Sequence, residues 1–364
     1  MQAFQRTCFI GFMLLLGLSL NGYGQTYHLY VAAESDDEVY QLSFDAQSQK
    51  GTVTDVVPVG QWPTENEGPH GINVGLDGKY WYLSIAHGNP YGWLYKYTTG
   101  TNEMVGRTEL GMFPASMEIS SATGLLYVVN FNLHGDMEPS TVSVVDPDAM
   151  QVVADIATGI MPHGSRITKD GRRQYHVSMM TDELIEINTG AMGIARRLNI
   201  APEGTSAANG SSSGKPAIKP TWADPHPTKS LVYVAGNGSD EIIEIDTQKW
   251  KVLRRFQTGI GTAPYNLEVT HDGKYVVGSY KGTGQTGIWN IEMGKEVAKI
   301  ANSRGVSHGV STTPDSKYAF ISVEGKGGEP GSVDIINMES LERVDVVEVG
   351  KQAGGIIFWK KDAD

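Results

Sequence analysis

The stretch that decides the fold is Pro69-His70-Gly71-Ile72-Asn73-Val74, followed by a turn at Asp77-Gly78 and the run Tyr80-Trp81-Tyr82-Leu83-Ser84. Two apolar runs joined by a two-residue Asp-Gly turn predict a β-hairpin. The same arrangement returns around His163, Tyr265 and His308, with weaker copies around Ser116, Thr221 and Gly355. Self-similarity at a regular spacing is typical of repeat architectures.

The repeat has the length of one propeller blade. Aligned on the turn, the positions equivalent to His70 are Ser116, His163, Thr221, Tyr265, His308 and Gly355, separated by 43 to 47 residues except for one gap of 58. A four-stranded blade has a period in the mid-forties, about that of these gaps. The long gap contains residues 201–216, a Gly-, Ser- and Ala-rich insertion that we expect to be a flexible loop.

Six full repeats run from residue 68 to residue 350, and the remaining segments make a seventh. Residues 27–32, 38–44 and 52–59 predict three N-terminal strands, and residues 355–358 predict one inner strand near the C-terminus. We therefore predict an all-β, seven-bladed β-propeller of four-stranded antiparallel blades in residues 25–364. Its ring is closed by the N-terminal strands together with the C-terminal inner strand.

Residues 1–24 have the pattern of a secretory signal peptide, because Arg6 precedes an apolar run at 8–20 and small residues follow it. That run is shorter than the ~20 residues of a spanning helix, so we expect no membrane span after cleavage. Cys8, the only cysteine, would be removed with this signal peptide, so disulfides and covalently attached haem are excluded from the mature protein. We expect an exported protein, periplasmic or extracellular.

The charge of the chain limits its partners. The formal net charge is −12, and loss of Arg6 makes it −13. Such an acidic surface argues against nucleic acid or anionic membrane as the main partner.

The repeat resembles a known family. Leu126-Tyr127-Val128-Val129-Asn130, the Pro-x-Gly…Asp-Gly-Lys-Tyr pattern and the Val142-Ser143-Val144-Val145-Asp146 ending are similar to the YVTN-type β-propeller repeat. Related exported propellers include the amino-terminal domain of nitrous oxide reductase, the haem-d1 domain of nitrite reductase and lactonase-like propellers. The resemblance implies the fold and does not assign an activity.

Five histidines are predicted to gather at one mouth of the channel. They are His70, His163 and His308 at the repeat position, and His87 and His134 in loops between second and third strands. Imidazoles without thiolates suit copper, zinc or iron. The resemblance adds that the nitrous oxide reductase propeller holds a copper cluster with channel-facing histidines, although four of the seven positions here are Ser116, Thr221, Tyr265 and Gly355. The polar residues among them, Ser116, Thr221 and Tyr265, predict contacts to an organic or anionic ligand instead, and a repeat turn that binds nothing stays open.

Further along each inner strand, three residues after the His70 position, the aligned residues are Asn73, Ile119, Arg166, Asp224, Glu268, Ser311 and Phe358. If they face the channel, Arg166, Asp224 and Glu268 are candidate acid–base or anion-binding residues. If they turn between blades, their charges need partners there.

We expect a scaffold that binds a small molecule, a metal or a protein at the channel mouth. The alternatives are a lactonase-like hydrolase and a propeller subunit associated with an oxidoreductase.

Overall fold

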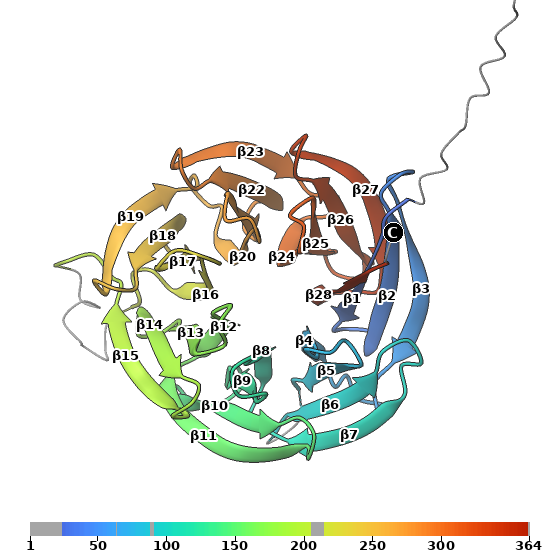
Figure 1. The fold of residues 1–364 in the computed structure, drawn as a ribbon, viewed down its shortest axis with the longest axis horizontal. Helices are drawn as coiled ribbons and strands as arrows, with labels where there is room; N and C mark the ends of the chain where they lie inside the picture. The colour runs from blue at the N-terminus through green and yellow to red at the C-terminus, as the bar shows by residue number, and fades with distance from the viewer. Residues whose placement is uncertain (1–23, 63, 88–90, 205–214, 363–364) are drawn as a thin grey trace, which may run out of the picture.

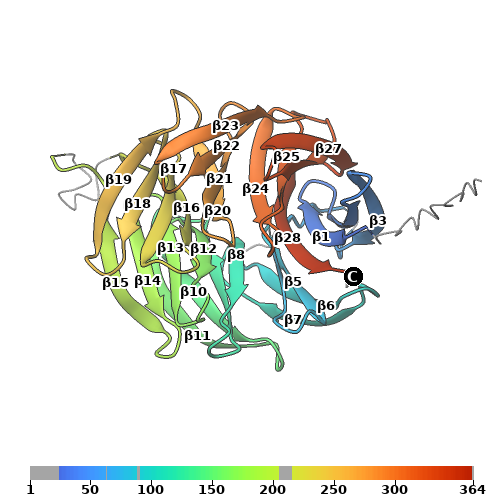
Figure 2. The same cartoon turned by 45° about the horizontal axis from the view of Figure 1, so that its top comes forward.

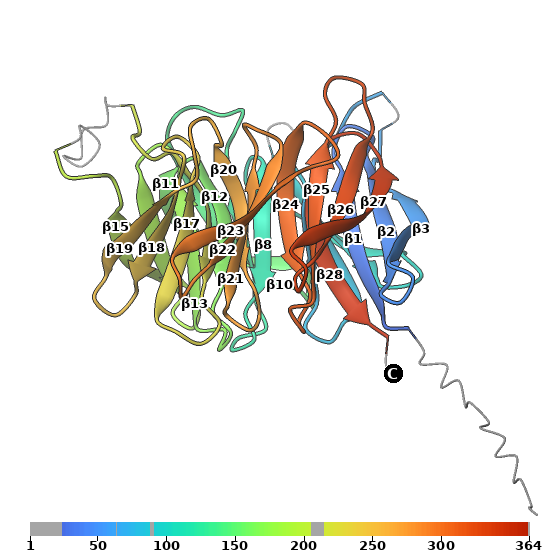
Figure 3. The same cartoon turned by 90° about the horizontal axis from the view of Figure 1, so that it is seen from above.

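The computed structural model describes residues 24–62, 64–87, 91–204 and 215–362, in which it contains 28 strands and no helix. The strands form seven four-stranded antiparallel sheets. Figure 1 shows the sheets arranged radially around one axis, and Figure 3 shows the disc from its side. The predicted seven-bladed β-propeller is confirmed.

Each blade begins with an inner strand at the channel and ends with an outer strand at the rim. The first three blades are β4 (Pro69–Val74), β5 (Tyr80–Ile85), β6 (Trp93–Thr98) and β7 (Met104–Glu109); β8 (Pro114–Ile119), β9 (Leu126–Asn130), β10 (Pro139–Asp146) and β11 (Gln151–Ile160); and β12 (Pro162–Ile167), β13 (Arg173–Ser178), β14 (Glu183–Asn188) and β15 (Gly193–Asn199). The next three are β16 (Pro220–Pro225), β17 (Leu231–Gly236), β18 (Glu241–Asp246) and β19 (Lys251–Gln257); β20 (Pro264–Val269), β21 (Tyr275–Tyr280), β22 (Gln285–Asn290) and β23 (Lys295–Ala301); and β24 (Val306–Thr312), β25 (Tyr318–Glu324), β26 (Gly331–Asn337) and β27 (Glu342–Val349). The seventh joins both ends of the chain: β28 (Ala353–Lys361), β1 (Thr26–Ala33), β2 (Glu38–Asp45) and β3 (Lys50–Pro58).

The seventh blade closes the ring as the sequence predicted. The C-terminal strand β28 pairs antiparallel with β1, from Tyr27↔Lys361 to Ala33↔Ala353. Figure 2 shows β28 beside β1 at the point where the chain returns to its beginning. The backbone N–H of Asp362 donates to the carbonyl of Thr26 at 2.9 Å, so the strand is held to its last described residue.

The core lies between blades. Where the first and last parts of the chain meet, Tyr27, Phe44, Tyr318 and Phe320 are buried in one cluster. Burial of aromatic side chains supplies much of the hydrophobic stabilisation of such an interface.

Aspartates on the mouth side join each of three blades to the next. Asp37, between β1 and β2, has φ of 52° and accepts the N–H groups of Glu67 and Gly68 at 3.0 and 2.8 Å. Asp182 and Asp240 do the same for the segments that enter β16 and β20. These contacts fix loops that surround the site.

Two predictions fall mainly on residues outside those described. The predicted signal peptide, residues 1–24, lies outside them apart from Gly24, and so do residues 205–214 of the predicted flexible insertion. No helix that could cross a bilayer occurs in the part of the chain that the structure describes.

Candidate functional site

Glycines bring the inner strands together at the mouth. A Cβ on Gly71 would lie 1.7 Å from the carbonyl oxygen of Ala115 on the next inner strand, and one on Gly355 would lie 2.1 Å from that of His70. Only glycine permits so close a backbone approach. The glycine of the Pro-His-Gly motif therefore serves packing, whereas the histidine before it is left to face the channel.

Six aromatic rings form a closed collar at the mouth, each contacting the next at centroid distances of 4.6 to 5.9 Å. In order around this collar they are His70, Phe113, Phe131, His163, Tyr265 and His308. The sequence predicted the three histidines and the tyrosine at this mouth. It missed Phe113 and Phe131, which lie just outside the repeated position, before β8 and after β9.

Glu34 holds two of the predicted histidines. Its carboxylate is 5% exposed and accepts hydrogen bonds from His70 Nδ1 at 2.7 Å and from His87 Nε2 at 3.1 Å. Burial alone would raise the pKa of Glu34, but the charge of His70 and these two hydrogen bonds together hold it well below its ordinary value. The same carboxylate raises the pKa of His87. His134 contacts the His87 ring at a centroid distance of 5.7 Å, which joins it to the group.

His163 is fully engaged by protein groups. Its Nδ1–H donates to the carbonyl of Thr221 at 2.7 Å, which leaves Nε2 to accept from the Tyr265 hydroxyl at 3.0 Å. Burial lowers the pKa of His163 to about 3, so this imidazole is neutral. His308 is different. Burial also lowers its pKa, but its Nδ1 has no hydrogen-bond partner among the described residues.

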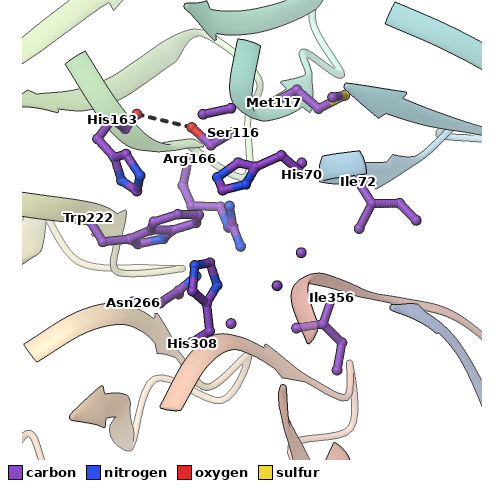
Figure 4. Close-up of a pocket in the computed structure, with 15 residues that line it drawn as sticks. His70, Ile72, Ser116, Met117, His163, Arg166, Trp222, Asn266, His308 and Ile356 are labelled. Atoms are coloured by element: carbon purple, nitrogen blue, oxygen red, sulfur yellow. Dashed lines mark hydrogen bonds between the residues drawn. The ribbon is translucent and has the colours of Figure 1, made fainter. Parts of the chain in front are cut away.

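The collar stands over a central cavity of about 40 Å³. Figure 4 shows His70, His163 and His308 around it, with Trp222, Asn266 and Arg166. Three residues that line it each contain a buried polar atom without a partner among the described residues: Trp222 Nε1, Asn266 Oδ1 and His308 Nδ1. Buried polar groups are hydrogen-bonded in nearly all folded proteins, so three such atoms on residues around one cavity make it the candidate binding site.

The hydroxyl groups of two predicted ligand-binding residues, Ser116 and Thr221, donate to carbonyl groups of the neighbouring blade. The Ser116 hydroxyl donates to the carbonyl of His163 at 3.0 Å, and that of Thr221 donates to the carbonyl of Tyr265 at 2.7 Å. Strand pairing also shows that the alignment of the blade that begins with β8 is wrong by one residue. Pro114 pairs with Asn130 as Pro69 pairs with Ile85, so Ala115, and not Ser116, is equivalent to His70. Ser116 nevertheless lines the cavity. A ligand contact from either hydroxyl stays a prediction.

The predicted acid–base residues Arg166, Asp224 and Glu268 line a second space of about 440 Å³, beside the hairpin turns at the other end of the channel. Each carboxylate binds the next blade: Asp224 accepts from the N–H of Val269 at 2.6 Å, and Glu268 from that of Thr312 at 3.0 Å. We expected these charges to need partners if the residues turn between blades, and the partners of Asp224 and Glu268 are backbone N–H groups of the next blade.

Glu118 belongs to this set and was missed. It accepts the N–H of Ile167 on the next blade, as Asp224 and Glu268 accept from theirs. The alignment had assigned this position to the following residue, Ile119. The one-residue offset of this blade is the reason. Arg166 differs from these carboxylates because it also lines the central cavity at the mouth, which we call the upper cavity. Its Nη2 lies 3.9 Å from Glu268 Oε2, and its guanidinium lies 4.8 Å from the Trp222 ring.

Glu118 predicts a pH dependence of stability. Burial raises its pKa to about 7 from 4.5, although the charge of Arg166 opposes the shift. The folded state therefore holds a proton that the unfolded state releases, and the resulting stabilisation is complete below pH 4.5 and is lost as the pH rises through about 7. We therefore expect the free energy of unfolding, measured by urea titration across that pH range, to fall by about 1–3 kcal/mol less in Glu118→Gln than in the wild type. A Glu118→Gln profile parallel to that of the wild type would contradict the assignment.

The five histidines do not converge as metal ligands. Among the described residues, no three His, Cys, Asp or Glu side chains are placed to hold one ion. His70 Nδ1, His87 Nε2 and both ring nitrogens of His163 face protein groups. Copper, zinc or iron at the mouth stays a prediction.

Comparison with known proteins supports the fold. No protein-family model and no curated sequence matches the chain. Among solved structures, the hydrazine synthase of Kuenenia stuttgartiensis is similar with a TM-score of 0.60 and 21% identity, over 77% of this chain and 79% of that one. A candidate 6-phosphogluconolactonase from Bacteroides fragilis is similar with a TM-score of 0.71 and 12% identity, over 94% of this chain and 99% of that one. Identities this low show the propeller fold alone, and membership of the YVTN-type family stays a prediction.

Proposed function

We propose that the chain is an exported binding protein whose central cavity, beneath the histidine mouth, holds the polar end of a small molecule. The observation that carries this proposal is that three residues lining one cavity, Trp222, Asn266 and His308, each retain a buried polar atom without a partner among the described residues. Leaving a buried polar group unpaired costs about 1–3 kcal/mol, so retaining three in one place favours a ligand that satisfies them.

The chemistry of these three atoms suits a polar group with both donors and acceptors. The indole N–H can only donate and the amide oxygen can only accept, whereas His308 Nδ1 can do either. His70, oriented by Glu34, presents a further ring nitrogen that has no partner among the described residues. The collar then surrounds the entrance with ring edges, which suits the less polar part of the same molecule.

Export is the second part of the proposal. It is supported by the leader pattern in residues 1–24 and by the resemblance to exported YVTN-type propellers. The hydrolase and the oxidoreductase-subunit alternatives stay predictions.

The binding part is tested by calorimetric titration with acetamide, acetate and glycerol. We expect at least one probe to bind one site, and Asn266→Leu to weaken binding of acetamide or glycerol, the two probes with a donor for the amide oxygen, about tenfold, the effect of one hydrogen bond. Because leucine removes an unpaired oxygen at similar volume, thermal unfolding of the probe-free variant should occur at the same temperature or a higher one. Absence of binding by all three probes, or acetamide or glycerol binding that Asn266→Leu leaves unaffected, would overturn the proposal.

A further inference from the structure

The upper cavity contains one permanent charge. Of the described residues that line it, Arg166 is the only one that carries a fixed charge, and none is Asp or Glu. Burial lowers the pKa values of the lining residues His163 and His308, which keeps both imidazoles neutral. The third lining histidine, His70, is paired with the Glu34 carboxylate at 2.7 Å. The electrostatic character of the cavity therefore depends mainly on how far the guanidinium is neutralised by other groups.

The guanidinium is only partly neutralised. Its one hydrogen bond to a described residue runs from Nη1 to the carbonyl of Ser165 at 3.0 Å, although the group has five N–H donors. The nearest carboxylate oxygen, Glu268 Oε2, is 3.9 Å from Nη2, beyond hydrogen-bond distance, and Glu268 is itself bound to Thr312. Arginine is thus left with free donors that face the channel.

The other carboxyl groups below Arg166 contribute less negative charge than their number suggests. Burial raises the pKa of Glu118 to about 7, and it raises that of Asp224 well above its ordinary value. Each of the two also gives one oxygen to a backbone amide of the next blade. The guanidinium consequently retains positive charge on the side of the upper cavity.

Trp222 completes a donor set. Its ring lies against the guanidinium at 4.8 Å, and its buried N–H, which can only donate, has no acceptor among the described residues. Figure 4 shows the guanidinium of Arg166 beside the Trp222 ring, in the space bounded by His70 and His308. A fixed cation against a ring that carries an unpaired donor favours an acceptor with negative charge.

We propose that the group bound in the upper cavity is a carboxylate, held by the Arg166 guanidinium and the Trp222 N–H, with the rest of its molecule, including a donor for Asn266 Oδ1, directed to the collar. This rests on the proposed binding function and names the ligand class. The cavity of about 40 Å³ has room for two or three water-sized atoms, which is the size of such a headgroup and not of a whole metabolite.

The test compares acetate with acetamide, a neutral probe of the same shape, by calorimetry on the full-length protein. We expect wild type to bind acetate about 10- to 100-fold more tightly than acetamide, the value of a charge-assisted hydrogen bond. Arg166→Gln should abolish this preference and leave acetamide binding within about twofold, since the amide keeps hydrogen-bonding capacity. Lys169→Gln is the matched control, because Lys169 is an exposed cation at the far-end cavity and should leave the preference unchanged.

The outcomes separate this inference from the proposal beneath it. Equal binding of acetate and acetamide by wild type, or a preference retained in Arg166→Gln, overturns the carboxylate assignment while ligand binding stands. If acetate, acetamide and glycerol all fail to bind, both proposals fail, whereas binding of glycerol alone overturns only the carboxylate assignment. Should Arg166→Gln not fold, Trp222→Phe replaces it: this variant keeps a ring against the guanidinium, and acetate affinity that does not fall would equally overturn the assignment.

Discussion

Removal of the C-terminal strand is expected to abolish cooperative folding. A chain that ends at Gln352 lacks β28, so the blade of β1, β2 and β3 loses its inner strand. The cluster between the ends of the chain loses Ala353 and Ile356, which are 0% and 5% exposed, and β1 is left with an unpaired edge. We expect a loss of more than about 5 kcal/mol, a large share of the 5–15 kcal/mol typical of a folded domain. Urea unfolding followed by tryptophan fluorescence and circular dichroism measures it.

A permuted chain distinguishes ring closure from simple loss of sequence. Asp362 N lies 2.9 Å from the carbonyl of Thr26, so residues 351–362 can be moved in front of Gln25 through an Asn-Gly turn and pair with β1 as a hairpin. This permutant contains the same strand at the other end of the chain and should recover a single transition close to that of the full-length protein. A truncated chain that unfolds like the full-length one, or a permutant that stays unfolded, would contradict closure by β28.

Gly71→Ala is expected to be the most damaging single methyl group. The new Cβ would lie 1.7 Å from the carbonyl oxygen of Ala115, and neither atom can rotate away, because the oxygen belongs to the backbone and the backbone fixes the position of a Cβ. Separating β4 from β8 would disturb the collar as well as the packing, and we expect a loss of about 3 kcal/mol or more in the free energy of unfolding.

The matched control for this glycine is Gly328→Ala. Gly328 is exposed and a Cβ there would meet no atom within 4 Å, so its effect should stay within about 0.5 kcal/mol. Equal stability of the two variants in chemical denaturation would show that the inner strands do not depend on glycine at this position.

The fold could be predicted because its information is local and repeated. Each hairpin carries its own turn, and the count of strands left at the two ends indicated the seventh blade. The mouth histidines followed from the same repeat, and ring contacts join His70, His87, His134, His163 and His308 into one group.

The partners of those histidines could not be predicted, because they come from other blades or from positions outside the repeat. Glu34 reaches His70 from the neighbouring blade, 36 residues away. Glu118 was missed through a one-residue shift that only strand pairing reveals. Nor does any pattern in the sequence state that Trp222 Nε1 is left without a partner among the described residues, since that depends on every neighbouring side chain.

The most direct test of ligand binding is a high-resolution crystal structure of the protein purified from its native source. We predict non-water density in the central cavity, within hydrogen-bond distance of Trp222 Nε1, Asn266 Oδ1 and His308 Nδ1. An empty cavity, or the same three atoms satisfied by protein groups or by water alone, would contradict the proposed binding function.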